Sequence, residues 1–382
     1  MEQINSINPH RIQWCCDDLK TTPEAVALEL GIPGSKMQTL MAGNGSLTFS
    51  QLTELASYFG RGVFFFLEAG RVDELKVHTA QFRTIASQKP DLSARFRTFI
   101  ERVEKQRQVF LGLNDEGDKD ESSRFQPPVL SGKSIEQAAG ITRQWLGLGQ
   151  RNSFDSYREA IEAKGILVFK SNGYAGKWQV SKDSPILGFN LFDPVCPVIV
   201  VKKLESEGRQ AFTLMHELGH VLLHRVSSID DGNDMSGTQG MEREANQFAG
   251  FVLVPTQFLN SIPEGDWPSH PAEYDSWLKE YRNAWSVSTE MILRRLLDVG
   301  RLDGAAYGAY REWLTTLPPR IVASGGARFR YKEPKQVFGD RFVRRVFDAL
   351  NARQITLSKA SDYLDGLKVK DIHQLKATYA SA

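Results

Sequence analysis

The chain has 382 residues, of which 41% are hydrophobic and 24% charged, and its formal net charge is +1. This balance is ordinary for a soluble protein of two to four domains and excludes a chain that is basic or acidic throughout. Three cysteines without a Cys-x-x-Cys pair, and a polar start without a signal peptide, favour a reducing cytoplasm. No apolar stretch reaches the roughly 20 residues that span a bilayer, so no membrane partner is expected.

Residues 8–70 are predicted to form a compact helical unit. Thr22 and Pro23 suit the cap and the first position of a helix, and Gly31 suits its end. A turn and a short helix at 35–42 follow. Helix, glycine turn and short helix are the components of a helix-turn-helix.

The same stretch resembles the helix-turn-helix fold of phage-repressor-like (XRE-type) regulators. The resemblance implies that the short helix enters the major groove of double-stranded DNA, with base contacts from Ser35, Lys36, Gln38 and Thr39. A homodimer is expected by the same analogy. Because only Lys36 is basic in this helix, a helical protein–protein module is the alternative.

Residues 71–112 are predicted to be helical and basic, with interspersed acidic residues that favour a solvated helix face over a nucleic-acid surface. The segment 114–128 is acidic, small and polar and ends in two prolines, which indicates a linker. Further on, helices are predicted at 135–146 and 154–164. A small sheet is predicted from three β-rich segments: 165–169, 186–191 and 198–201.

An HExxH motif stands at His216-Glu217-Leu218-Gly219-His220, in a segment whose other residues suit a buried helix. Positions i and i+4 share one helix face, so His216 and His220 can bind one Zn2+. Glu217 can then act as the base that takes a proton from the attacking water. The alternative is a buried helix with two hydrogen-bonded histidines.

A catalytic zinc site needs a third protein ligand and one open position. Glu244 begins a second apolar helix that ends at Pro255, and it can come against the histidine face. Glu242 is an alternative ligand about 200° around that helix, so only one of the two can face the metal. His224 continues the i+4 row and is a further alternative, although capping of the helix end is its favoured role.

The two segments FTLMHELGHVLLH and EREANQFAGFVLVP resemble the ImmA/IrrE family of zinc metallo-endopeptidases. The resemblance implies that His216, His220 and Glu244 bind zinc and that Glu217 is the base. It also implies a gluzincin-like core, so the predicted fold is mainly α with a small β-sheet. In HExxH peptidases generally, an edge strand of the sheet pairs with extended substrate, and either 186–191 or 198–201 is the expected edge.

After Pro255 the chain is predicted to be mainly helical to about residue 317. The segment Trp285–Leu296 resembles a helix of the same family. Packing of this helix on the peptidase core is favoured, and contact of Arg294 or Arg295 with DNA is the alternative. A hinge is predicted at 318–335, and helices at 340–350 and 358–364. Basic and aromatic residues from Arg328 to Arg345, including Phe338 and Phe342, suit either a nucleic-acid strand or a docked tail. The predicted domains are 1–70, 71–128, 129–317 and 318–382.

Two functions follow. The first is a cytoplasmic zinc endopeptidase fused to a DNA-binding unit; the resemblance implies one protein substrate, a repressor or antitoxin-like protein, whose cleavage controls transcription in a stress or mobile-element response. The second is a DNA-binding regulator or antitoxin-like protein with a structural or sensory zinc. The intact Glu217 favours the enzyme, because a structural site has no need for a base.

Overall fold

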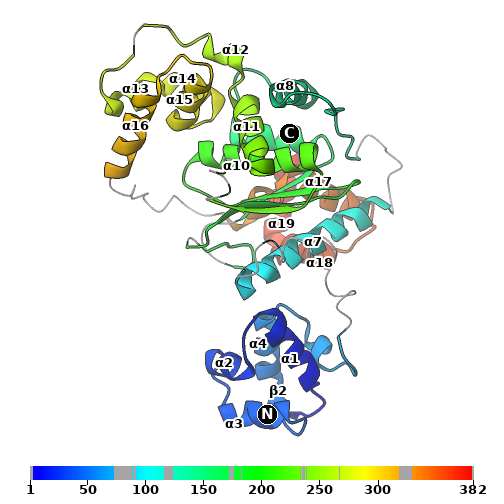
Figure 1. The fold of residues 1–382 in the computed structure, drawn as a ribbon. Helices are drawn as coiled ribbons and strands as arrows, with labels where there is room; N and C mark the ends of the chain where they lie inside the picture. Colours follow the sequence, from blue (N-terminus) through cyan, green and yellow to red (C-terminus); the bar gives the residue numbers. More distant parts are fainter. Residues whose placement is uncertain are drawn as a thin grey trace. The chain divides into compact units, whose positions relative to one another are not determined.

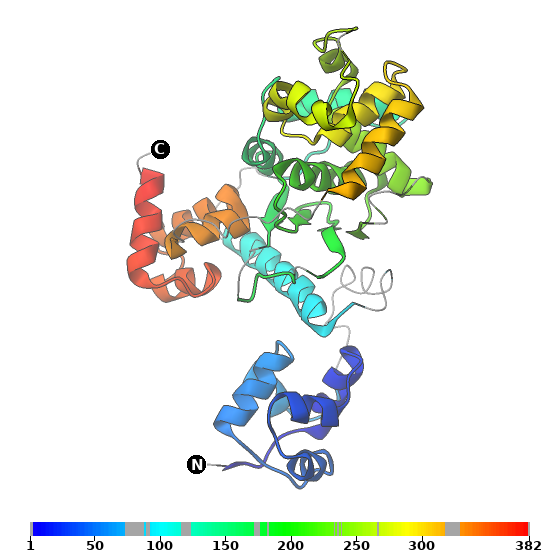
Figure 2. The same cartoon turned by 90° about the vertical axis from the view of Figure 1, so that its left-hand side faces the viewer.

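The computed structural model describes residues 3–72, 88, 92–115, 124–171, 176–181, 183–232, 234, 237, 239–265, 267–317 and 329–380. The chain divides into two compact units, Met1–Lys105 and Gln106–Ala382. The predicted fold class, mainly α with a small β-sheet, is confirmed (Figure 1, Figure 2). Over the described ranges, no helix is both long enough and apolar enough to cross a membrane.

The first unit is a group of short helices with a two-stranded antiparallel sheet. Its elements are β1 (Gln3–Ile4), α1 (Pro9–Asp18), α2 (Pro23–Glu29), α3 (Gly34–Met41), β2 (Leu47–Thr48), α4 (Phe49–Tyr58) and η1 (Val63–Phe66). Thr22 caps α2 by accepting a hydrogen bond from the backbone N–H of Ala25, as the sequence predicts. Gly31, at φ +63°, turns the chain from α2 towards α3. The assignment of this unit as a DNA-reading helix-turn-helix stays a prediction.

Helix α7 (Ala94–Asp115) starts in the first unit and ends in the second. Within the first unit, Arg61 forms two hydrogen bonds of 2.8 Å with Glu101, and Arg97 pairs with Asp18 at 3.0 Å. The bidentate Arg61–Glu101 pair and the Arg97–Asp18 pair fix the start of the helix. The rest of the predicted 71–112 helix, residues 73–87 and 89–91, lies outside the described residues, as do 116–123 of the predicted linker.

The second unit is built on a four-stranded sheet in the order β3-β5-β4-β6. Its strands are β3 (Leu167–Lys170), β4 (Ile186–Leu191), β5 (Val198–Val201) and β6 (Ser228–Asp231). β3 and β5 are parallel, and the other two pairs are antiparallel. The expectation that 186–191 or 198–201 is an edge strand is wrong, because both strands lie inside the sheet. β6 was not predicted, and it forms one edge of the sheet.

Helices cover both faces of this sheet (Figure 1). On one face lie α8 (Ile135–Leu146), α9 (Phe154–Glu162), α10 (Glu207–Gly219) and α11 (Gly240–Leu253). Their shared core contains Leu214, Leu218, Phe248 and Val252, all 0% exposed. Because the sheet covers α10 on one side and α11 covers it on the other, every residue from Thr213 to Gly219 is buried, including the polar ones.

A helical group follows α11 in the chain. It consists of α12 (Thr256–Leu259), η5 (Pro271–Glu273), α13 (Tyr274–Trp277), α14 (Lys279–Trp285), α15 (Thr289–Asp298) and α16 (Gly304–Thr316). Arg295 on α15 is buried, donates a hydrogen bond to the carbonyl of Val254 and lies over the ring of Phe251. This arrangement supports the packing role for α15; Arg294 is the more exposed of the pair.

The C-terminal helices belong to the second unit. They are η6 (Arg330–Lys332), α17 (Glu333–Asn351), α18 (Leu357–Tyr363) and α19 (Val369–Ala380), of which α19 was not predicted. Phe338 and Phe342 of α17 are buried against Phe169 of β3, on the sheet face opposite α10. These two rings are therefore unavailable to stack on nucleic-acid bases. Residues 318–328 of the predicted hinge lie outside the described residues.

A buried carboxylate joins α9 to a kink in α17. Gly339 interrupts α17 with φ +83° and ψ 170°, a conformation essentially restricted to glycine. The kink frees the backbone N–H groups of Asp340 and Arg341, and both donate to Glu162 at 3.1 Å. A Cβ atom on residue 339 would overlap this carboxylate. Glu162 thus acts as an N-cap for the second half of α17.

Candidate active site

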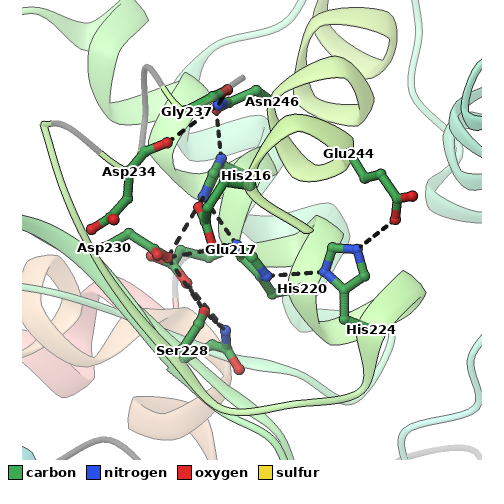
Figure 3. A network of polar contacts seen from close by, with 12 residues as sticks. His216, Glu217, His220, His224, Ser228, Asp230, Asp234, Gly237, Glu244 and Asn246 are labelled. Atoms are coloured by element: carbon green, nitrogen blue, oxygen red, sulfur yellow. Dashed lines mark hydrogen bonds and ion pairs between the residues drawn. The ribbon is translucent and has the colours of Figure 1, made fainter. Parts of the chain in front are cut away.

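The HExxH residues lie at the C-terminal end of α10, against the sheet. Ser206 caps this helix by accepting a hydrogen bond from the N–H of Arg209 at 3.3 Å. The helix changes to a π-helical turn at His220–His224, which ends at Arg225 with φ +56°. π-Helical turns occur often at functional sites. Here the wider turn leaves His216, His220 and His224 in one row (Figure 3).

Four side chains bring possible metal-binding atoms to within 4.8 Å of one another: His216, His220, Asp230 and Glu242. The Nε2 atoms of His216 and His220 are 3.1 Å apart. The carboxylate of Glu242 lies 3.3 Å from the first and 3.6 Å from the second of these nitrogens. These separations suit donors on one small cation, because the donors of a tetrahedral site with bonds of about 2.0–2.1 Å are about 3.3 Å apart.

The structure does not place Glu244 in this cluster. Its side chain is 52% exposed, and its carboxylate pairs with Nε2 of His224 at 3.1 Å (Figure 3). The structure therefore brings Glu242, and not Glu244, to His216 and His220, while the metal-binding set of His216, His220 and Glu244 stays a prediction. The reason is the rotation of α11, whose buried residues Ala245, Phe248, Ala249 and Val252 face α10.

The apolar residues of α11 carry part of the signal for that rotation, although the sequence does not show which face of α11 meets α10. Glu242 lies about one helical turn before Ala245 and therefore on the buried face of α11, whereas Glu244 lies to the side of that face. Close approach of the two helices also needs Gly219 on α10, since a Cβ there would lie 3.3 Å from the Cα of Ala245.

Neighbouring groups orient both imidazoles. Nδ1 of His216 lies 2.9 Å from the Oδ1 of Asn246, whose amide nitrogen donates to the carbonyls of Asp234 and Gly237. Because Asn246 presents oxygen, His216 keeps its proton on Nδ1 and directs Nε2 to the cluster. Sequence analysis did not assign Asn246 a role.

A second chain of contacts runs from the other imidazole. Nδ1 of His220 lies 3.0 Å from Nδ1 of His224, which in turn contacts Glu244. Glu244 and His224 thus hold the Nδ1 side of His220, the side opposite the metal-binding cluster, and neither of them is a member of the cluster.

Glu217 lies beneath the cluster and is completely buried. Its Oε2 accepts hydrogen bonds from Nδ2 of Asn190 at 3.2 Å and from Oγ of Ser228 at 3.3 Å, while Oε1 accepts none from any described residue. The carboxylate fits against β4 because residue 188 is glycine; a Cβ there would lie 2.7 Å from Oε1. Burial, reinforced by the nearby Asp230, raises the pKa of Glu217 well above its ordinary value.

Imidazoles and carboxylates stabilise each other's charged forms within the cluster. Burial disfavours the charged imidazole, yet contacts with Asp230 and Glu242 outweigh it and raise the pKa of His216 to about 9. Burial likewise opposes the charge on Glu242, but the two histidines lower the pKa of its carboxyl to about 2. Buried carboxylates are stable only beside positive charge, so these residues fit a divalent metal ion.

The four predicted DNA-contacting residues lie on α3 of the first unit. Ser35, Gln38 and Thr39 are exposed, whereas Lys36 is half-buried and donates from Nζ to Oε1 of Gln51 at 2.7 Å. Residues 1–72 carry five basic and seven acidic side chains, a net charge of −2 (5 − 7). A negative balance disfavours non-specific attraction to phosphates, so any DNA contact depends on the α3 face itself.

Two histidines one helical turn apart, a glutamate from a second helix and a buried glutamate beside them define the class of metallopeptidases. In agreement with this, residues 161–297 match the family model of the IrrE N-terminal-like domain, Peptidase M78. Over these residues the chain matches a peptidase family of the ImmA/IrrE type, as the sequence resemblance implied. A search of curated proteins finds no match to the chain.

Proposed function

We propose that the chain is a cytoplasmic zinc endopeptidase that cleaves one protein partner, a repressor or antitoxin-like protein. The observation that carries the proposal is the free, buried Oε1 of Glu217 beside the metal-binding cluster. Burying a carboxylate oxygen without a hydrogen-bond partner is costly. A catalytic base explains that cost, whereas a purely structural or sensory zinc site does not require it.

Each residue of the site has a separate role. His216, His220 and Glu242 would hold the cation; Zn2+ suits imidazole and carboxylate ligands, and when bound it lowers the pKa of water and polarises a carbonyl. Glu217 takes a proton from the attacking water at Oε1 and passes it to the leaving amine. Asn190 and Ser228 hold its other oxygen and so fix the direction of Oε1. Asn246 keeps His216 in the required tautomer.

The edge of β6 is a suitable surface for extended substrate. β6 pairs with β4 on one side, and no described strand pairs with its other side. Main-chain hydrogen bonds to such an edge hold a peptide with little dependence on its sequence. A substrate strand at β6 would therefore run beside the cluster.

The change that tests this proposal is Glu217→Gln, which keeps the size of the side chain and removes the base. We expect the variant to retain its metal and to lose cleavage by at least about 100-fold, the usual contribution of a general base. The measurement incubates zinc-loaded full-length protein with repressor-type proteins encoded beside its gene and detects new termini by mass spectrometry. Cleavage at the wild-type rate by Glu217→Gln would refute the proposed role.

We further propose that the first unit binds double-stranded DNA through α3, as a homodimer. Replacing the exposed Gln38 by alanine should then weaken binding to the promoter DNA of its own gene by about 5- to 100-fold, since one good base contact is worth about 1–3 kcal/mol. Fluorescence anisotropy measures the change. The matched control is Gln13→Ala, an exposed glutamine on α1. Equal binding by both variants would favour the protein–protein module.

A further inference from the structure

Asp230 is the one member of the metal-binding cluster that neither helix supplies. It lies on the edge strand β6 and is only 2% exposed. A catalytic zinc site needs three protein ligands and keeps one position open. His216, His220 and Glu242 already make three, so a fourth buried donor calls for an explanation.

The position of Asp230 is that of a ligand. Its Oδ2 lies 3.6 Å from Nε2 of His216 and 3.8 Å from Nε2 of His220. These two distances, and the three distances among the donor atoms of His216, His220 and Glu242, all lie between 3.1 and 3.8 Å. A tetrahedron of zinc donors has edges of about 3.3 Å. The four side chains therefore surround one point in the manner of a closed, four-ligand site.

The strand holds Asp230 there. Asp230 and Ser228 point to the same side of β6, and Oγ of Ser228 lies 3.3 Å from Oδ2 of Asp230. The backbone is paired with β4, where Gly188 is the partner of Asp230. Since the same Ser228 hydroxyl also contacts Glu217, the strand positions the fourth donor and the base together.

We infer that Asp230 occupies the fourth coordination position of the cation in the resting protein, so that the site is closed by its own edge strand. The inference rests on the proposed metallopeptidase function. Its consequence is that an outside ligand enters only when β6 shifts. A substrate strand that adds to the free edge of β6 acts on the same backbone, which couples substrate binding to the release of Asp230.

The test loads full-length wild type, Asp230→Asn and Asp231→Asn with one equivalent of Co2+ and titrates each with acetohydroxamate. The visible cobalt spectrum reports ligand entry. If the wild-type site is open in a tenth of molecules or fewer, its apparent affinity is weaker than that of Asp230→Asn by about tenfold or more. Asp231→Asn removes the same charge from the opposite side of the strand and should behave as wild type.

A second measurement does not depend on a variant. Electron–nuclear double resonance of the wild-type cobalt protein, compared in H2O and D2O, should find no exchangeable water on the metal. Equal hydroxamate affinity in wild type and Asp230→Asn, or a bound water in the wild type, overturns the inference and leaves the peptidase proposal intact. A wild type that binds no Co2+ or Zn2+ overturns both.

Discussion

Replacing Glu242 by alanine should remove the metal, whereas Glu244→Ala should leave about one metal ion per chain. The carboxylate of Glu242 lies 3.3 and 3.6 Å from the two imidazole nitrogens that face the cluster. Glu244 contacts His224 instead. Loss of a direct ligand should reduce zinc affinity by more than the roughly 10- to 100-fold that a supporting group contributes.

The measurement is zinc per chain by elemental analysis after dialysis against a weak chelator, with all proteins purified without a metal-binding tag. The two glutamates are matched controls for each other, because they lie two residues apart on α11 and the same substitution is made at both. Retention of zinc by Glu242→Ala with loss by Glu244→Ala would restore the ligand set that the sequence resemblance implied.

Replacing Arg158 by methionine should lower the free energy of unfolding of the second unit by about 3–5 kcal/mol, the usual result of leaving a buried charge without its partner. Arg158 is 5% exposed and pairs with Glu162 at 3.0 Å. Its other nitrogens donate to the carbonyls of Val168 on β3 and of Gln336 and Val337 on α17. One guanidinium thus joins α9, the sheet and the C-terminal helices.

The substitution also leaves Glu162 alone in its apolar site, where burial already raises the pKa of its carboxyl against the opposing effect of Arg158. Urea unfolding followed by tryptophan fluorescence measures the change, because Trp178 contacts Phe338 of α17. Arg151→Met is the control: Arg151 is exposed, and its loss should change stability by less than about 0.5 kcal/mol. A comparable effect of both changes would contradict the proposed role of Arg158.

Local signals explain the parts of the fold that were predicted correctly. The helices at 135–146 and 154–164 carry Ser134 and Ser153 as N-caps, and both caps form as expected from the residue type. β5 was predicted from a run of β-branched residues, and β4 from a short apolar segment. β6 has the sequence Ser-Ile-Asp-Asp, which carries no such run, and pairing with β4 alone makes it a strand. Local propensity is too weak to reveal a strand of that kind.

The amino-acid sequence by itself placed His216 and His220 on one helix face beside Glu217, and it indicated the family that residues 161–297 match. The placement of the two histidines follows from their spacing along one helix, which needs no knowledge of the rest of the fold. The family follows from the resemblance of two sequence segments. Only the tertiary structure shows that Glu242 rather than Glu244 lies beside the two histidines, and that Asp230 lies there as well. Both depend on how α11 is rotated against Gly219 and on which strand lies at the sheet edge, and packing between distant segments sets these features.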